Sequence, residues 1–447
     1  MSPALHEFLS IDLGPILAAT FACVSCALLG NFLVLRRVSL MGDAISHAVL
    51  PGLVLAFMIT GTRDPLPMFI GAAAAGIVTV GLVEAMRRYT RIEPGAAMGV
   101  VFSVLFALGV LMLERGAGRQ VDLDADCVLN GLLEAMIWFV PDQWSQVLTW
   151  DAIASLPRQV WTLAIVAAVV SILVVVFFKE LRIVCFDPGL ATSLGFPASA
   201  VNGVFMVLVA CVTVASFEAV GSILVIAMLI CPPAAARMLT DRLRSQVLTS
   251  VLIAACCAVG GYTLAAFGPG WFGASRSVSA SGMIAIVSGV AMASAMLLGP
   301  RHGVIARSVR RTRLAITIAT EDLLAWVYRM EERARPAQIE LAAETIGSYG
   351  LTLKLATARA TRLGLLISEN GNLRLTETGR RNATSLVRTH RLWESYLVER
   401  GGYAPDHVHD AAMRLEHAVD PDRHVRLEPP EPSTPLDPHQ RPIPPRS

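Results

Sequence analysis

The apolar segment SLMGDAISHAVLPG contains an aspartate and a histidine four residues apart, Asp43 and His47. On a helix this spacing places both side chains on one face, about one turn apart, so a single cation can contact both. A carboxylate oxygen with an imidazole nitrogen suits manganese, zinc or ferrous iron better than calcium or sodium. Spacing alone leaves two interpretations open: a metal site, or an interfacial aspartate beside an unrelated histidine.

A second group of potential ligands lies near the C-terminus. Its imidazole, carboxylate and thioether groups recur at helical spacing: His390, Glu394, His409, Met413, Glu416 and His417. On helices these sets share single faces, and their density is typical of a transition-metal site. Ordinary surface helices also carry such groups, so the spacing does not decide between a metal site and an ordinary solvent-exposed helix face.

Both groups belong to a chain that is too apolar for an ordinary soluble protein. Of its 447 residues, 54% are hydrophobic and 16% charged, and its mean hydropathy is +0.58. This composition predicts a polytopic membrane protein. The net charge of +2 does not suggest nucleic acid, although basic residues are concentrated after position 300. The N-terminus lacks a basic region and a cleavage signature, so we expect the first helix to be retained.

Windows of about 20 apolar residues predict eight or nine membrane spans. They lie near 13–35, 43–60, 66–86, 95–113, 160–178, 200–218, 221–238, 247–267 and 282–299. The count depends on whether Gly221 or the Pro232-Pro233 pair splits the segment 200–238 into a span and a re-entrant helix. Basic clusters at alternate span ends place the C-terminal third in the cytoplasm and the 115–158 loop outside.

The sequence pattern changes to that of a soluble domain beyond the spans. Helices are expected at 320–334, 336–347 and 351–366, followed by two strands around an Asn370-Gly371 turn and a helix from Thr378. This order predicts a winged helix. We divide the chain into a transmembrane domain over 1–305, a basic linker over 306–319, a cytosolic domain over 320–425 and a Pro-rich, disordered tail over 426–447.

Three blocks resemble the zinc/manganese/iron class of ATP-binding-cassette permeases, the ABC-3 type. They are GNFLVLRRVSLMGDAISHAVLPGLVLAF, FDPGLATSLGFP at 186–197 and FEAVGSILVIAMLICPPAAARMLTDRL at 217–243. The resemblance implies a substrate path between two permease subunits, with Asp43 and His47 as metal ligands. It also implies an extracytoplasmic metal-binding protein that delivers the ion.

Two side chains cannot complete a coordination shell, so further ligands are expected from the second permease subunit, water or other carboxylates. Within this chain Glu218 is a candidate because it is a lone carboxylate in an apolar segment, although a boundary charge at the outer interface explains it equally well. Asn31 and Met41 are weaker candidates.

The chain contains no G-x-x-x-x-G-K-[ST] phosphate loop and no Gly-Lys dipeptide. It is therefore not expected to bind nucleotide or to be an enzyme, and a separate ATP-binding subunit is expected. The segment PPAAARMLTDRLRS reads as a basic cytosolic helix after a proline break, which the resemblance implies is the helix that couples to the ATPase. A basic stop after a span is the alternative. The candidate coupling residues are Arg237, Asp241, Arg242 and Arg244.

The C-terminal block resembles the metal-binding and dimerisation segment of iron- and manganese-dependent repressors of the diphtheria-toxin-repressor class. Its T-x-x-G, H-R-L-x-E and V-H-x-x-A-x-x-x-E-H elements imply that His390, Glu394, His409, Glu416 and His417 are ligands. Met413 falls where some relatives use a cysteine or a carboxylate.

The preceding winged-helix half resembles that class less closely. Its candidate reading helix, LTLKLATARATRLG, offers Lys354, Arg359 and Arg362. These cations suffice for phosphate contact but do not make a rich base-reading surface.

The expected protein is an all-α polytopic membrane protein of 8–9 transmembrane helices, with a cytosolic winged-helix plus helical metal-binding and dimerisation domain. Its expected function is ATP-driven import of manganese, zinc or ferrous iron across the bacterial inner membrane, with the C-terminal domain sensing the metal. The alternative is a secondary carrier or channel-like permease whose C-terminal domain is a membrane-tethered, metal-dependent DNA-binding regulator. A domain that only dimerises is a third possibility.

Overall fold

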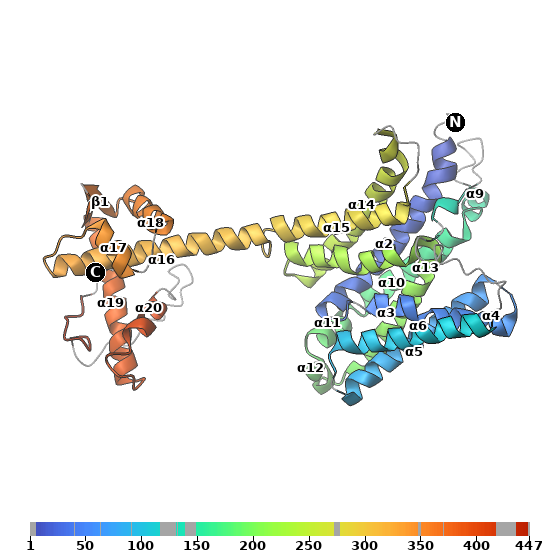
Figure 1. Ribbon diagram of the computed structural model, residues 1–447, viewed down its shortest axis with the longest axis horizontal. Coiled ribbons are helices and arrows are strands. Elements are labelled where there is room, and N and C mark those ends of the chain that lie inside the picture. The colour runs from blue at the N-terminus through green and yellow to red at the C-terminus, as the bar shows by residue number, and fades with distance from the viewer. Residues whose placement is uncertain are drawn as a thin grey trace. The chain divides into compact units, whose positions relative to one another are not determined.

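The computed structural model describes residues 6–39, 41–62, 64–90, 92–116, 131, 133–138, 149–271, 278–346, 350–369, 371–416 and 435–445. The chain divides into two compact units, Met1–Ala306 and Arg307–Ser447 (Figure 1). Each unit has its own hydrophobic core.

The first unit is a bundle of apolar helices. After a short π-helical turn at Phe8–Asp12, its helices are α2 (Leu13–Leu35), α3 (Met41–Ala48), α4 (Leu50–Thr60), α5 (Pro65–Thr90), α6 (Pro94–Gly116), α9 (Trp150–Ala154), α10 (Arg158–Val176), α11 (Phe178–Phe186), α12 (Pro188–Ser193), α13 (Ala198–Leu239), α14 (Leu243–Trp271) and α15 (Ala280–Leu298). Within the described residues, eight helical stretches are long and apolar enough to cross a membrane, which confirms the expected polytopic class.

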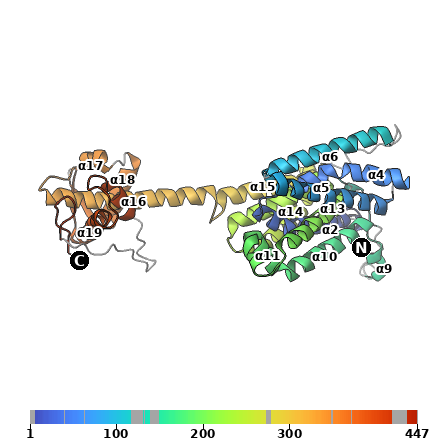
Figure 2. The ribbon, with the colours of Figure 1, turned by 90° about the horizontal axis from the view of Figure 1, so that it is seen from below.

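Two of these helices form the centre of the bundle. The most apolar windows of α2 and α13 are 72% and 67% buried, whereas those of α5 and α6 are 28% and 22% buried. Close packing at the centre depends on small residues, since a side chain at Gly30 of α2 would overlap the Leu229 carbonyl of α13. Figure 2 shows α4, α5 and α6 side by side at the edge of this unit.

The long helix α13 contains a break at Gly221, where φ is 78° and ψ is 162°. On the two sides of the break, Phe205 and Leu229 contact the same part of α2: the Phe205 ring lies 5.9 Å from that of Phe32, and the Leu229 carbonyl lies against Gly30. In an unbroken helix, residues 205 and 229 would be about 36 Å apart. The chain therefore turns back at Gly221, a backbone conformation that glycine tolerates, and α13 comprises two segments.

The second unit follows the expected order of helices and hairpin. Its elements are the distal part of α16 (Val304–Glu332), α17 (Ile339–Ile346), α18 (Leu351–Arg362), β1 (Leu366–Glu369), β2 (Asn372–Leu375), α19 (Glu377–Glu399) and α20 (His409–Glu416). The two strands are antiparallel, with Leu366 opposite Leu375. The buried faces of the helices pack around Leu323, Val327 and Leu353.

Two segments differ from the sequence-based expectations. The basic linker 306–319 is not a separate connection, because it is helical and continuous with the rest of α16. Within the tail expected to be disordered, residues 435–445 form a turn in which Leu436 pairs with Pro442. The Asp437 carboxylate accepts the backbone N–H groups of His439 and Arg441 at 2.9 and 2.7 Å, so polar contacts order a segment that has few large apolar residues.

Candidate metal sites

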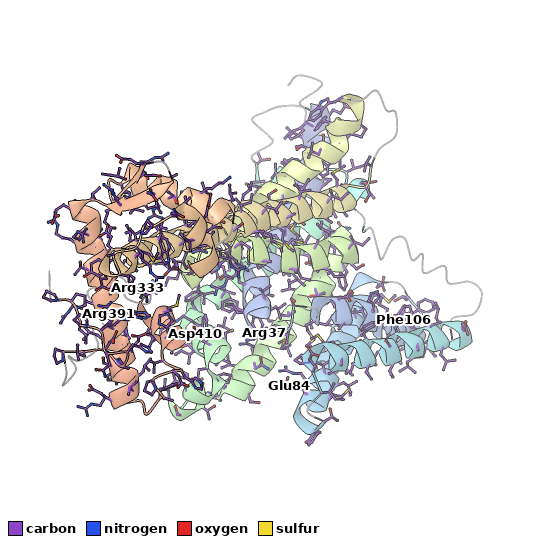
Figure 3. All side chains as sticks on the ribbon, turned by 60° about the vertical axis from the view of Figure 1, so that its left-hand side comes forward. Arg37, Glu84, Phe106, Arg333, Arg391 and Asp410 are labelled. Carbon is purple, nitrogen blue, oxygen red and sulfur yellow. The ribbon has the colours of Figure 1, made fainter. Side chains whose placement is uncertain are left out.

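Asp43 and His47 lie one turn apart on α3, with 3.5 Å between the carboxylate Oδ1 and the imidazole Nε2. Their side chains are 35% and 45% exposed. The His47 ring also contacts α6, with centroid distances of 5.6 Å to Phe102 and 6.0 Å to Phe106, which Figure 3 labels. The pair is thus supported on one side by aromatic rings and open on the other.

The other ligand candidates in the membrane unit are not gathered around this pair. Among the described side chains, Glu218 does not join Asp43 and His47 in a group whose ligand atoms all lie within 4.8 Å of one another. The Asn31 amide donates to the Ala27 carbonyl and to Ser250 in the core. Met41 is 2% exposed. If Asp43 and His47 bind a metal ion, the further ligands must come from outside this set of residues, and the exposed side of the pair leaves room for them.

The expected separate coupling helix is contradicted by the structure. α13 continues through Pro232-Pro233 to Leu239, so Arg237 lies on its last turn, and the chain bends before α14 begins at Leu243. Of the two places for a break that the sequence offers, the backbone leaves the helical conformation at Gly221, where φ is positive, and the proline break expected before the coupling helix is wrong. Arg242 lies in the bend and Arg244 in the first turn of α14.

Asp241, in the same bend, is held by an arginine and a histidine side chain. Its carboxylate oxygens lie 2.7 Å from Arg301 Nη1 and 2.6 Å from His302 Nε2. Hydrogen bonds from His302 and Arg301 lower the pKa of Asp241 to about 2. The bend is therefore tied to the segment that follows α15, and Asp241 is ionised at neutral pH.

A compact ligand cluster lies between α19 and α20. Glu394 Oε1 is 3.0 Å from His390 Nε2 and 2.8 Å from His409 Nδ1, and these two nitrogens are 3.0 Å apart. His390 and Glu394 are one turn apart on α19, and His409 is the first residue of α20. Within the part of the chain that the structure describes, this is the group of three or more His, Cys, Asp or Glu residues that can hold a metal ion.

The chemistry of the cluster fits a transition metal. Burial raises the pKa of Glu394, but hydrogen bonds from His390 and His409 and their charges outweigh it, so its pKa is well below the ordinary value. The carboxylate is therefore an anionic ligand at neutral pH. A single proton on His390 Nε2 cannot be donated to both Glu394 and His409. A cation coordinated by all three atoms satisfies them together.

The second expected ligand set is only partly described. Met413 lies half-buried on α20, and Glu416 is the last residue of that helix. His417 and the side chain of Glu416 lie outside the described part, so the role of Met413, Glu416 and His417 stays a prediction.

One further histidine was missed by the sequence-based reasoning. His439 Nε2, in the turn 435–445, lies 3.8 Å from Glu394 Oε1. Composition assigns this segment to a disordered tail, and no spacing rule connects it with α19. The sequence signal that could have pointed to this residue is the histidine itself, in Asp437-Pro438-His439.

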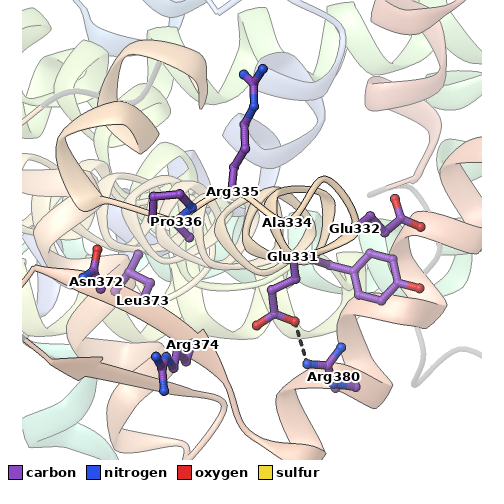
Figure 4. A pocket seen from close by; sticks show the side chains of 11 residues that line it. Glu331, Glu332, Ala334, Arg335, Pro336, Asn372, Leu373, Arg374 and Arg380 are labelled. Atoms are coloured by element: carbon purple, nitrogen blue, oxygen red, sulfur yellow. Dashed lines mark hydrogen bonds and ion pairs between the residues drawn. The ribbon is translucent and has the colours of Figure 1, made fainter.

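The cavity of about 570 Å³ in the second unit is a poor metal site. It lies between the end of α16 and β2, and Figure 4 shows its lining, which includes Glu331, Glu332, Arg335, Arg374 and Arg380. Glu331 Oε2 is 2.6 Å from Arg380 Nη2, and Glu332 Oε2 is 2.6 Å from Arg391 Nη2. These carboxylates are already neutralised by arginines.

The buried Arg391 is expected to stabilise the second unit. Its side chain is 3% exposed and binds Glu332, the Pro442 carbonyl and Asp437, whose side chain is 2% exposed. Arg391→Met leaves Asp437 buried without its cation, so we expect a loss of about 3–5 kcal/mol in unfolding free energy. The urea dependence of amide exchange in α19 measures it.

Arg380→Met is the matched control for this prediction. Arg380 also lies on α19 and pairs with a glutamate at the end of α16, but its side chain is 49% exposed. Its loss should cost less than about 1 kcal/mol. Equal effects of the two substitutions would show that burial of Arg391 does not stabilise the unit.

The fold and these two sites define an integral membrane protein whose second unit carries a cluster of potential metal ligands. The chain belongs to the ABC 3 transport family, whose sequence profile matches residues 12–133 and 143–299. The profile of the iron dependent repressor, metal binding and dimerisation domain matches residues 376–445. This second match includes the turn 435–445, so the expected domain end at 425 is too early.

Known transport proteins match the first unit of this chain, and one of the matches extends beyond that unit. The chain is 44% identical over 287 residues to the manganese transport system membrane protein MntD of Bacillus subtilis, covering 64% of this chain and 92% of that protein. It is 36% identical over 368 residues to the zinc transport system membrane protein TroD of Treponema pallidum, covering 81% and 95%. The second match exceeds the length of the first unit, so it extends beyond Ala306.

A solved structure supports the fold of the membrane unit. PsaBC from Streptococcus pneumoniae, in complex with Fab, superposes with a TM-score of 0.50 and 28% identity, covering 65% of this chain and 92% of that one. The family, the relatives and this fold agree with the resemblance found in the sequence.

Proposed function

We propose that this chain is the permease subunit of an ATP-binding-cassette importer for manganese, zinc or ferrous iron in the bacterial inner membrane. The Asp43–His47 pair carries this proposal, because it places an anionic oxygen and an imidazole nitrogen 3.5 Å apart on a membrane helix of a chain in the ABC 3 transport family. Relatives named as manganese and zinc transport proteins support the substrate class.

The open side of the pair supports a two-subunit path. A carboxylate and an imidazole that are each at least one-third exposed on a membrane helix must face protein or water rather than lipid. A second permease subunit therefore supplies or shields the remaining coordination positions. Because two ligands hold an ion loosely, the site can also release it.

Transport in proteoliposomes tests the proposal. The permease is reconstituted with its ATP-binding subunit and the extracytoplasmic metal-binding protein, and uptake of ⁵⁴Mn²⁺ or ⁶⁵Zn²⁺ is followed. We expect uptake only when ATP is present on the cytoplasmic side. Uptake driven by a proton gradient without ATP would establish the secondary carrier instead.

We place the ATPase-docking surface at the bend 240–242 together with the short helix α12. Arg36, which follows α2, bonds to Cys185 and Asn202 on the two sides of α12, so this region lies at the cytosolic end predicted from charge. Leu190 of α12 and Leu194, which directly follows it, are 50% and 58% exposed beyond the ends of the spans. Exposed leucines outside the bilayer favour a protein contact.

Reversing the charge of Arg242 tests this surface. Arg242→Glu should lower ATP-dependent uptake about tenfold or more, since a repulsive charge across an interface costs several kcal/mol. Insertion into the membrane should be unchanged. Arg158→Glu, an exposed arginine at the other end of a span, is the control. Normal coupled uptake by Arg242→Glu would remove this bend from the docking surface.

The second unit we assign as a cytosolic metal gauge of the permease. Two features of α18 disfavour the DNA-binding alternative: Leu351 and Leu355 are 73% and 41% exposed beside Lys354, and Arg359 bonds to Thr317. Arg362 is the third candidate cation. Tight, salt-sensitive binding of the metal-loaded protein to a specific duplex would overturn this assignment.

A further inference from the structure

We propose that His439 is a fourth ligand of the His390–Glu394–His409 cluster, so that a bound metal ion links the C-terminal turn 435–445 to both α19 and α20. The inference rests on the proposed metal gauge. It adds a ligand, His439, and a segment whose position depends on the metal, the turn 435–445. Its basis is the position of His439 Nε2, 3.8 Å from the oxygen that the other two histidines share.

The distances within the cluster are close to those between the ligands of a tetrahedral metal site. With metal–ligand bonds of about 2.1 Å, the ligand atoms of a tetrahedron lie about 3.4 Å apart. The three atoms of the cluster are 2.8–3.0 Å apart, somewhat closer than this, and His439 Nε2 is 3.8 Å from Glu394, somewhat farther. His439 is not within 4.8 Å of all three ligand atoms, so an ion at the centre spreads the three, and the His439 imidazole must rotate toward the ion to complete the shell.

Local contacts hold His439 within reach without burying it. The Asp437 carboxylate fixes the backbone of the turn, and Arg391 of α19 lies 3.6 Å from that carboxylate and 2.6 Å from the Pro442 carbonyl. The His439 side chain remains 38% exposed. The turn is thus anchored next to the cluster, while the imidazole is free to rotate toward an ion.

The fourth ligand decides both the coordination geometry of the site and its preference among metal ions. Three imidazoles and one carboxylate form a closed four-ligand shell of the kind that structural zinc sites use. Nitrogen-rich sites favour zinc over manganese, which prefers oxygen ligands. We therefore expect the cluster to bind Zn²⁺ more tightly than Mn²⁺, and bound Zn²⁺ to stabilise the turn further.

Zinc binding by the full-length protein in detergent tests the role of His439. A His47→Ala background removes the membrane site, and Zn²⁺ affinity is measured by competition with a chelating dye. His439→Ala should weaken binding about 10- to 100-fold or more, the loss seen when even an outer partner of a metal ligand is removed. Zn²⁺ should also slow amide exchange in residues 435–445 of the parent, but not of His439→Ala.

A cysteine variant tests direct ligation. His439→Cys should bind Co²⁺ and give a thiolate-to-cobalt charge-transfer band, because cysteine thiolate ligates such ions. His407→Cys is the control, since His407 is 76% exposed and lies beside Asp406 in the loop before α20. A band in both variants or in neither, or unchanged Zn²⁺ affinity in His439→Ala, would overturn the assignment of His439.

One more variant separates this inference from the proposed gauge. If His390→Ala weakens Zn²⁺ binding but His439→Ala does not, the cluster binds metal with three protein ligands and only the role of His439 is wrong. If neither substitution changes Zn²⁺ binding, the second unit does not bind metal at this cluster and the gauge itself is wrong.

Discussion

Replacing either Asp43 by asparagine or His47 by alanine is expected to lower metal uptake about 100-fold or more. Each substitution removes one of the two ligands that α3 offers, and even the loss of an outer partner of a ligand costs 10- to 100-fold in metal affinity. Asp43→Asn keeps the size of the side chain and removes its charge. The measurement is the initial rate of ATP-dependent ⁵⁴Mn²⁺ or ⁶⁵Zn²⁺ uptake at equal amounts of membrane-inserted protein.

Glu84→Gln is the matched control for these variants. Glu84 is an exposed carboxylate on α5 that pairs with Arg87 at 3.2 Å. Its replacement should leave the uptake rate within about twofold, since exposed ion pairs contribute little. Normal uptake by both Asp43→Asn and His47→Ala would refute the central proposal, whatever the result for the second unit.

The membrane architecture was largely predictable because long apolar runs follow directly from bilayer thickness. The path of α13 was not, since the local sequence offers both Gly221 and Pro232-Pro233 as places for a break. Proline removes one N–H and can remain within a helix when neighbouring groups compensate, whereas a positive φ can be adopted at glycine without strain. Packing of both halves against α2 decides that the chain turns back at Gly221.

The ligand pairs were predictable where spacing on one helix brings them together. Asp43 with His47, and His390 with Glu394, are each four residues apart and lie 3.5 and 3.0 Å apart. His439 could not be found this way, because it reaches Glu394 from a separate segment. Its position depends on Asp437 and Arg391, which are buried although they are charged. A prediction based on apolar content does not take such buried polar residues into account.

Loss of the cluster in the second unit is expected to release the permease from inhibition by its own substrate. In the parent, raising Zn²⁺ on the cytoplasmic side should reduce uptake, because metal binding at the cluster favours the inhibited state. Coupling between two such sites typically amounts to about 1–3 kcal/mol, or 5- to 150-fold. In His390→Ala and Glu394→Gln, we expect uptake to stay at its low-metal rate over the whole Zn²⁺ range.

Glu331→Gln is the control for this last prediction, since Glu331 is also a half-buried carboxylate of the second unit but is paired with Arg380. Zn²⁺ on the cytoplasmic side should inhibit uptake by Glu331→Gln as it does in the unmodified protein. Linkage supplies a second, independent measurement, because a coupling that acts on binding must be reciprocal. Occupancy of the transport site should therefore weaken Zn²⁺ binding at His390, Glu394 and His409 by the same factor. If Zn²⁺ still inhibits uptake by both His390→Ala and Glu394→Gln, the second unit does not regulate transport through this site.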